Sequence, residues 1–125
     1  MRIGDIPAVR SLAHRTVDHC YRSFYPPGAL HYFKVLHTDE AIEQDMREGY
    51  AVVATAGRQI IGCGAVSDAH VQRVYVDPAW QRQGIGRRIV ERLELHAADC
   101  HESELYLDVN PGALGFYERL GYVVR

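Results

Sequence analysis

The sequence predicts an α/β domain in which a central mixed β-sheet is flanked by helices. Helical periodicity fills the first part of the chain, strand-like runs follow from residue 50, and a strand–helix–strand succession comes near the end. That succession implies a right-handed crossover between parallel strands, whereas the hairpins before it imply antiparallel neighbours, so the sheet should be mixed. A length of 125 residues fits one domain, residues 1–125.

Two helices are predicted before the first strand. Apolar residues recur at close to helical period from Ile6, and the first helix should reach about His19. An irregular aromatic segment, broken by a Pro-Pro-Gly sequence, is expected at residues 21–37. Thr38 offers a capping hydroxyl to a second helix, which Gly49 should end.

Strand-like runs occupy residues 50–55, 59–66, 70–76, 105–109 and 122–125. The first two should form a hairpin across an Ala-Gly-Arg turn. Gly62 and Gly64 either weaken the second strand or allow a close approach to its backbone. A long helix should start near Gly84, and a short final helix should follow Asn110.

Charge and cysteine content exclude several classes of function. The net charge is −2, so no basic bias points to nucleic acid. The cysteines Cys20, Cys63 and Cys100 show no metal-ligand spacing, so we expect reduced thiols, no metal and a cytoplasmic protein. We recognise no signal peptide and no apolar run long enough to cross a membrane, so no membrane partner is expected.

The most informative segment joins the third strand to the long helix. The β-branched run Val71–Val76 is followed by a proline and then by the turn Gly84-Ile85-Gly86, which opens a basic amphipathic helix. The backbone N–H groups of such a turn lie beside the positive end of the helix dipole. This arrangement predicts a binding place for a diphosphate.

Spacing excludes two common phosphate loops and leaves a third. No Gly-x-x-x-x-Gly-Lys-Ser/Thr sequence is present. The third glycine of a dinucleotide-binding fingerprint would fall on Ile89, so that pattern also fails. The pattern Gln/Arg-x-x-Gly-x-Gly/Ala is satisfied by Gln81-Arg82-Gln83-Gly84-Ile85-Gly86.

With this motif the chain resembles the GNAT superfamily of N-acetyltransferases, which use acetyl-CoA. The resemblance covers residues 6–122 and is also strong in Asn110-x-x-Ala113-x-x-Phe116-Tyr117-Glu118-x-Leu120-Gly121-Tyr122. It implies the GNAT-like acyl-CoA N-acyltransferase fold, with a splay between two parallel strands, here residues 70–76 and 105–109. The pantetheine arm of the cofactor is expected in that gap.

The resemblance also implies how the cofactor is held. The amides of residues 82–87 should bind the CoA pyrophosphate, and the glycines of the turn let phosphate oxygens approach the backbone. The strand backbone should pair with the pantetheine amides like an extra strand. Asn110 has a second explanation as an N-cap before Pro111. The implied cofactor contacts are Val74, Val76, Gln81, Arg82, Gln83, Gly84, Ile85, Gly86, Arg87, Asn110 and Tyr117.

Acetyl transfer to an amine needs both a proton acceptor and a proton donor. Tyr117 matches the family tyrosine near the CoA sulfur and is the implied general acid; a purely structural role of its ring is the alternative. The usual family glutamate position falls on His70, whose imidazole can accept a proton directly or through water. Glu104 and a relay of ordered waters are the other candidate bases. Cys63 is expected to fill core space, so direct attack in a ternary complex is predicted.

The expected function is transfer of acetyl from acetyl-CoA to a primary amine of a small molecule or peptide. The aromatic residues at 21–37 either enclose this acceptor or pack the helices on the sheet. The alternative is a non-catalytic CoA- or acyl-CoA-binding regulatory module, which the missing glutamate favours. Against the family pattern both ends are short and a C-terminal strand is missing, so we expect a homodimer or an incomplete C-terminal sheet.

Overall fold

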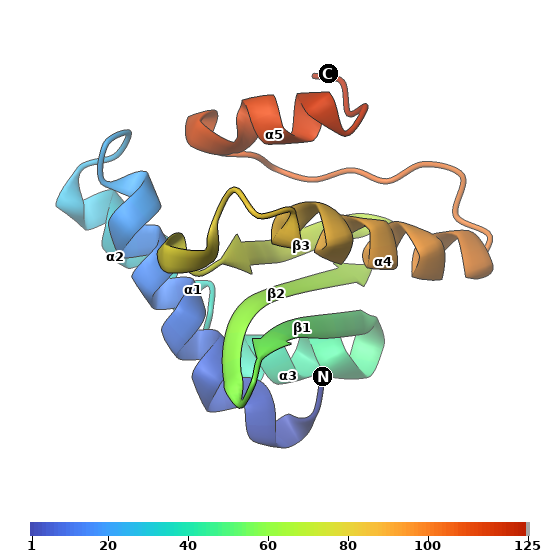
Figure 1. Cartoon of the computed structure of the whole chain (residues 1–125), viewed down its shortest axis with the longest axis horizontal. Coiled ribbons are helices and arrows are strands. Elements are labelled where there is room, and N and C mark those ends of the chain that lie inside the picture. Colours follow the sequence, from blue (N-terminus) through green and yellow to red (C-terminus); the bar gives the residue numbers. More distant parts are fainter. Residues whose placement is uncertain (125) are drawn as a thin grey trace.

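Three helices precede a three-stranded sheet, and two more helices follow it (Figure 1). The computed structural model describes residues 1–124. The helices and strands are α1 (Ile6–Tyr21), α2 (Pro27–Val35), α3 (Asp39–Glu48), β1 (Tyr50–Ala56), β2 (Gln59–Ser67), β3 (His70–Val76), α4 (Ile85–Asp99) and α5 (Leu114–Arg119). Short 3₁₀ turns lie at Ile3–Asp5, Pro78–Trp80 and Pro111–Ala113.

The strands form an antiparallel sheet in the order β1-β2-β3. A parallel bridge between His70 and Tyr106 adds one contact at the outer edge of β3. In Figure 1, α4 crosses in front of β3 while α3 lies behind β1, so helices cover both faces. The predicted α/β fold with a central sheet flanked by helices is confirmed, but the three strands are antiparallel, and the parallel component is limited to the bridge at Tyr106.

Each face of the sheet has its own buried cluster. On one face, apolar residues of α1 and α3 pack against Cys63 of β2. On the other face, α4 packs through Ile89 and Leu93 against Val66 and Val71. The long helix is amphipathic as expected, because Ile89, Leu93 and Ala97 are buried while Arg87 and Arg88 are exposed.

Gly62 and Gly64 allow α4 to approach β2 closely. A Cβ added at Gly64 would lie 2.6 Å from Ile89 Cγ2, and one at Gly62 would lie 2.9 Å from Ile89 Cδ1. Atoms cannot approach so closely without a shift, so these two positions set how deeply α4 sits on the sheet. Of the two interpretations of these glycines, close approach is the correct one.

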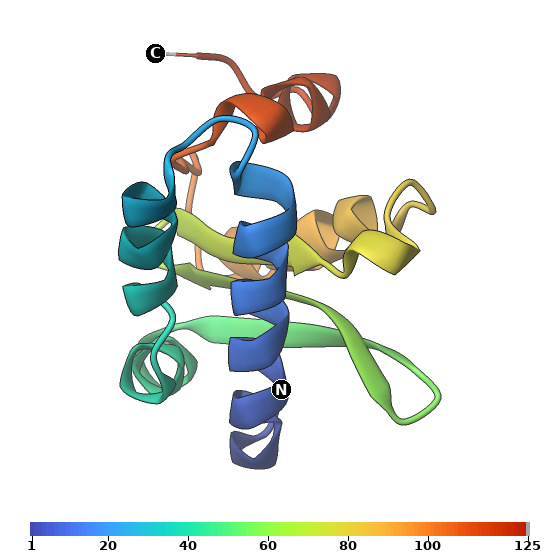
Figure 2. The same ribbon diagram turned by 90° about the vertical axis from the view of Figure 1, so that its left-hand side faces the viewer.

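Residues 21–37 are not irregular throughout, because α2 forms within them. Pro27 occupies the first helical position of α2, where its missing N–H costs nothing and its fixed φ favours the helix. The helix therefore begins inside the predicted break. Figure 2 shows α2 beside α1, with the connection between them close to α5.

Two of the predicted strands do not form. Residues 105–109 make only the bridge at Tyr106, and residues 122–124 have no strand assignment; Arg125 lies outside the described residues. Both runs have β-branched or aromatic composition. Strand structure also needs a partner ladder, and a local sequence pattern does not supply one.

Candidate active site

The turn before α4 has the geometry of an anion-binding helix start. Gly84 is the N-cap of α4, with φ at 82°, a left-handed conformation that glycine adopts without cost. The first helical bond runs from Arg88 N to Gly84 O at 3.1 Å. The amides of Ile85, Gly86 and Arg87 precede that bond, so the helix offers them no acceptor. Three N–H groups at the positive end of a 15-residue helix can thus receive an anion.

Side chains next to the turn tie it to β3. Gln81 Nε2 donates to Val76 O at 3.0 Å. Asp77 Oδ1 accepts from Ala79 N at 3.0 Å, which caps the Pro78–Trp80 turn. The turn is therefore connected to the last residue of β3 by local hydrogen bonds.

The charged and polar side chains of the turn point outward. Arg87 Nε donates to Glu91 Oε1 at 3.0 Å on the exposed face of α4, a pairing of residues four positions apart. Arg82 is exposed and has φ at 64°. Gln83 and Arg88 are also exposed. The inward contact of this region comes from Gly86, where an added Cβ would lie 3.2 Å from Phe116 Cζ of α5.

The outer edge of β3 is paired at its beginning and opens toward its end. Val71 N donates to Tyr106 O at 2.9 Å, and Tyr106 N donates to Ala69 O at 2.9 Å. Further along, Asp77 N donates to Ile61 O at 2.8 Å on the β2 side. Successive residues of a strand direct their backbone N–H and C=O groups to opposite sides. Those of Val76 therefore face the edge away from β2. This edge is where the strand could receive an extended ligand.

Tyr117 lies on α5 and is 7% exposed. Its ring packs edge-on against Phe116, with ring centroids 4.9 Å apart, and against Tyr122 at 5.6 Å. Burial, and secondly the neighbouring Tyr21, raises the pKa of Tyr117. The phenol is therefore protonated at neutral pH, which is the state that a proton donor needs.

Asn110 forms the N-cap that its sequence predicted. Its Oδ1 accepts from Gly112 N at 2.9 Å at the start of the Pro111–Ala113 turn. A cofactor contact of Asn110 would therefore fall to its amide nitrogen or its backbone. A Cβ added at Gly112 would lie 2.9 Å from Phe24 Cε2, so the α1–α2 connection contacts this turn.

His70 lies at the first residue of β3, six residues before Val76, which is about 20 Å along an extended strand. Its ring stacks on Tyr106, with centroids 4.6 Å apart and planes nearly parallel. Its Nε2 lies 3.7 Å from Asp108 Oδ2. The structure thus separates His70 from the Gly84 turn by the length of β3.

An open groove includes Tyr117 and the alternative base Glu104 among its lining residues. This open groove of about 1120 Å³ runs between α4, residues 104–109, α5 and residues 121–124. It reaches from Ala69, the neighbour of His70, to Tyr117. The residues of the Gly84 turn are not among its lining, so the groove and the turn are separate features.

On the α1–α3 face, polar residues at both ends of the predicted segment 21–37 contact β3, a connection that the sequence did not indicate. Tyr75 Oη is 3.3 Å from Tyr21 Oη and 2.9 Å from His37 Nε2. Burial, followed by the charges of Arg73 and His14, lowers the pKa of His37 to about 3. His37 is therefore neutral at pH 7. Its signal in the sequence is faint, because a single histidine before a helix cap is typical of loops.

The described residues contain neither a cluster of potential metal ligands nor a helix able to span a membrane. Residues 1–124 contain no group of three or more His, Cys, Asp or Glu side chains that could hold a metal ion. No helix of this part of the chain has the length and apolar character needed to span a membrane.

A family model described as an acetyltransferase (GNAT) domain matches residues 20–125. The chain belongs to the GNAT acetyltransferase family. The resemblance inferred from the Gln81–Gly86 and Asn110–Tyr122 motifs is thereby confirmed, and with it the expectation of a transferase domain.

Two named proteins share sequence with this GNAT domain. Glucosamine 6-phosphate N-acetyltransferase 1 of Oryza sativa subsp. japonica is 38% identical over 63 residues, which cover 50% of this chain and 37% of that protein. The [citrate [pro-3S]-lyase] ligase of Klebsiella pneumoniae is 25% identical over 72 residues, which cover 58% of this chain and 21% of that protein. The match thus spans less than half the length of either relative.

Solved structures of GNAT proteins have the same fold. A GCN5-related N-acetyltransferase from Rhodopseudomonas palustris superposes with a TM-score of 0.90 at 16% identity, covering 98% of this chain and 78% of that one. The PaiA N-acetyltransferase from Thermoplasma acidophilum, solved in complex with coenzyme A, gives 0.82 at 16% identity, with 97% and 84% covered. At such low identity the likeness establishes the fold alone.

Proposed function

We propose that this domain transfers the acetyl group of acetyl-CoA to a primary amine of a small molecule or peptide. The observation that carries the proposal is the turn at Gly84, whose three following amides lack helical acceptors at the start of α4. Membership of the GNAT family and the coenzyme A bound to the Thermoplasma relative support acetyl-CoA as the donor. The rice relative acts, by its name, on glucosamine 6-phosphate, so an amino sugar phosphate is one acceptor to test.

In this proposal the cofactor extends from the turn along the open edge of β3. The pyrophosphate binds the amides of residues 82–87, and the pantetheine arm follows the backbone of Val74 and Val76. Gln81, which bonds Val76 O, keeps the turn and the strand end together. Asn110 and Tyr117 border the other side of the arm. Support for this course comes from residues 107–109, for which the described part of the chain shows no backbone hydrogen bond to β3 beyond the bridge at Tyr106.

The reaction is a direct transfer. The amine nitrogen attacks the thioester carbonyl carbon, a C–N bond forms, and the C–S bond breaks with its electron pair on sulfur. A lysine-like amine with a pKa of about 10.4 must first lose a proton, which passes to His70, Glu104 or water, and the attacking nitrogen loses a second proton to solvent as the amide forms. Tyr117 gives its proton to the departing thiolate and regains one from solvent. The raised pKa of Tyr117 keeps that proton in place before the reaction.

An acyl-enzyme route through Cys63 is disfavoured. The Cys63 side chain is 1% exposed, and burial raises the pKa of its thiol to about 12. Its Sγ donates to Arg73 O at 3.3 Å. A buried, protonated thiol engaged in a hydrogen bond is a poor nucleophile, which supports direct attack.

Release of free thiol from acetyl-CoA in the presence of a panel of primary amines tests the activity. Calorimetry with CoA on two variants tests the site. Gly84→Asp and Gly84→Asn have nearly the same shape, and both residues tolerate a left-handed backbone, but only Asp adds negative charge. We expect Asp to abolish CoA binding and Asn to retain much of it. Equal binding by the two variants would show that the pyrophosphate lies elsewhere.

The second candidate is a non-catalytic CoA- or acyl-CoA-binding module. The observation that favours it is His70, which stands where a family glutamate is expected and stacks on Tyr106. Tight CoA binding without acceptor-dependent thiol release across the amine panel would select the module. Thiol release with any amine would exclude it.

A homodimer and a cytoplasmic location complete the proposal. Tyr106, Val123 and Val124 are exposed large apolar residues along the groove beside residues 105–109. An uncovered edge with such residues favours association with a second copy. The cytoplasmic location rests on the three cysteines, which form no disulfide. A monomer in sedimentation at micromolar concentration would remove the dimer from the proposal.

A further inference from the structure

Strand β3 contains a bulge in the middle of its pairing with β2. Cys63 pairs with Tyr75 and Ala65 pairs with Gln72, so Arg73 and Val74 together face Gly64 alone. Arg73 takes φ at 56°, a left-handed conformation that is costly for a residue with a Cβ. Such a conformation persists only where surrounding contacts enforce it.

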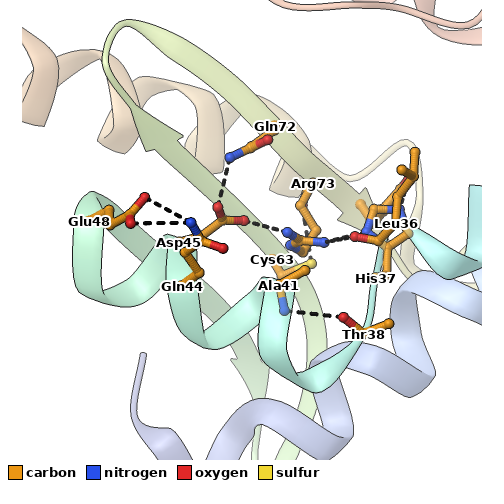
Figure 3. Close-up of polar contacts among 11 residues, drawn as sticks. Leu36, His37, Thr38, Ala41, Gln44, Asp45, Glu48, Cys63, Gln72 and Arg73 are labelled. Carbon is orange, nitrogen blue, oxygen red and sulfur yellow. Dashed lines mark hydrogen bonds and ion pairs between the residues drawn. The ribbon is translucent and has the colours of Figure 1, made fainter.

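The side chain of Arg73 supplies one set of those contacts. It is 7% exposed and reaches across to α3, where its Nη2 pairs with Asp45 Oδ2. Its Nη1 donates to His37 Nδ1 and to Leu36 O, the latter at 3.3 Å. Gln72 Nε2 donates to the other oxygen of Asp45 at 2.9 Å. Figure 3 shows Arg73 between Asp45 on one side and Leu36 and His37 on the other.

The backbone of Arg73 is held from the neighbouring strand. The Cys63 thiol donates to Arg73 O at 3.3 Å, and burial keeps that thiol protonated by raising its pKa. The bulged residue is therefore fixed on its carbonyl by β2 and on its guanidinium by α3. Charge pairing of a buried Arg with Asp45 is the strongest of these contacts.

The same guanidinium sets the direction of a hydrogen-bond chain. Arginine can only donate, so His37 Nδ1 must be the acceptor and neutral His37 carries its proton on Nε2. The Nε2–H group therefore donates a hydrogen bond to Tyr75 Oη, and the Tyr75 hydroxyl in turn donates to Tyr21 Oη.

We propose that Arg73, anchored by Asp45, is a positioning residue for the cofactor gap. The bulge begins two residues after Val71, the last residue of β3 bonded to Tyr106, so it lies just beyond the point where the backbone bonds between β3 and residues 105–109 end. Fixing the bulge fixes how the edge at Val74 and Val76 faces that gap. This inference rests on the proposed function, which puts the pantetheine arm there.

Three variants test the anchor. Arg73→Gly keeps the left-handed backbone but removes the guanidinium. Asp45→Asn keeps the shape of the carboxylate and leaves Arg73 in place without its charge partner. The matched control is Arg47→Gln, which breaks an exposed ion pair with Glu43 on the same helix. For each variant the folded fraction is measured first, and acetyl-CoA affinity, KM and kcat are then expressed per folded molecule.

Loss of the anchor should weaken CoA binding and lower kcat/KM for acetyl-CoA by about 100-fold in Arg73→Gly, the effect of an ångström-scale misplacement. Asp45→Asn should show the same changes to a smaller extent, and Arg47→Gln should show none. A purely structural role would reduce the folded fraction but leave affinity and KM unchanged, and that result would overturn the proposal.

Hydrogen exchange of the backbone amides, measured without ligand, tests the anchor independently of CoA binding. In Asp45→Asn the amides of Val74 and Tyr75 should exchange faster relative to amides of β1, whereas in Arg47→Gln their relative rates should match the unmodified protein. Equal relative rates in both variants would overturn the anchor, including the case in which Arg73→Gly does not fold. Failure of the unmodified protein to bind CoA would instead refute the proposed function.

Discussion

Lowering the pH from 7 to 5 should destabilise the fold through His37. Its side chain is 7% exposed, and burial, then Arg73, then His14 lowers its pKa from 6.5 to about 3. The contacts explain the direction of the change. Arg73 donates to Nδ1, so a second proton on the ring would face a guanidinium at the position that now accepts.

The size of the effect follows from proton linkage. The unfolded chain protonates His37 near pH 6.5, whereas the folded chain does so only near pH 3. Because the unfolded state binds more protons between these values, the stabilisation is complete above pH 6.5 and is lost as the pH falls toward 3. Each pH unit inside this window costs about 1.4 kcal/mol, so the step from pH 7 to pH 5 should cost about 2 kcal/mol.

Urea unfolding at pH 7, 6 and 5 measures this cost. The comparison is between the unmodified protein and His37→Gln, which keeps a donor toward Tyr75 but cannot titrate. The variant is expected to be less stable at pH 7 and to lose about 2 kcal/mol less than the unmodified protein on acidification. His31→Gln, at an exposed position of α2, is the matched control and should keep the original pH slope. Identical slopes for His37→Gln and the unmodified protein would refute the reasoning.

Three further predictions concern single positions. Tyr117→Phe should lower kcat by about 100-fold or more with unchanged CoA affinity, as stopped assays and calorimetry can check; an unchanged rate removes Tyr117 from the mechanism. Gly64→Ala should cost about 1–3 kcal/mol in urea unfolding, because its Cβ would lie 2.6 Å from Ile89, whereas Gly28→Ala meets no atom within 4 Å and should cost nothing. Thr38→Ala should cost about 1 kcal/mol by thermal melting, since it removes the side-chain acceptor that caps α3.

The sequence correctly predicted helices and strands whose ends are marked by capping or turn residues. The strand His70–Val76 has the predicted bounds, because turn residues stand on both sides of it. The N-cap at Thr38 and the start of α4 after Gly84 were also predicted correctly. Residues 105–109 have the composition of a strand but make a single bridge, because pairing depends on a neighbour that composition does not reveal.

The candidate site likewise has one part that the sequence predicts and one part that it does not. The Gly84 turn is a local structure, so its motif predicts both its conformation and the helix that follows. The anchor of Arg73 joins residues 28 and 36 positions apart in the sequence and depends on a left-handed arginine inside a β-branched run. Neither the spacing nor the composition of residues 70–76 indicates that conformation, so only the folded chain reveals it.

The sequence Gly62-Cys63-Gly64 connects the two parts of the candidate site. On one face of β2 its glycines let Ile89 approach, which sets the depth of α4 and hence the position of the Gly84 turn. On the other face the Cys63 thiol bonds the carbonyl of the bulged Arg73. The Gly84 turn and the bulge are thus both positioned against the same three residues of the central strand. A substitution there should disturb both ends of the cofactor path, although none of the three residues is expected to touch the cofactor.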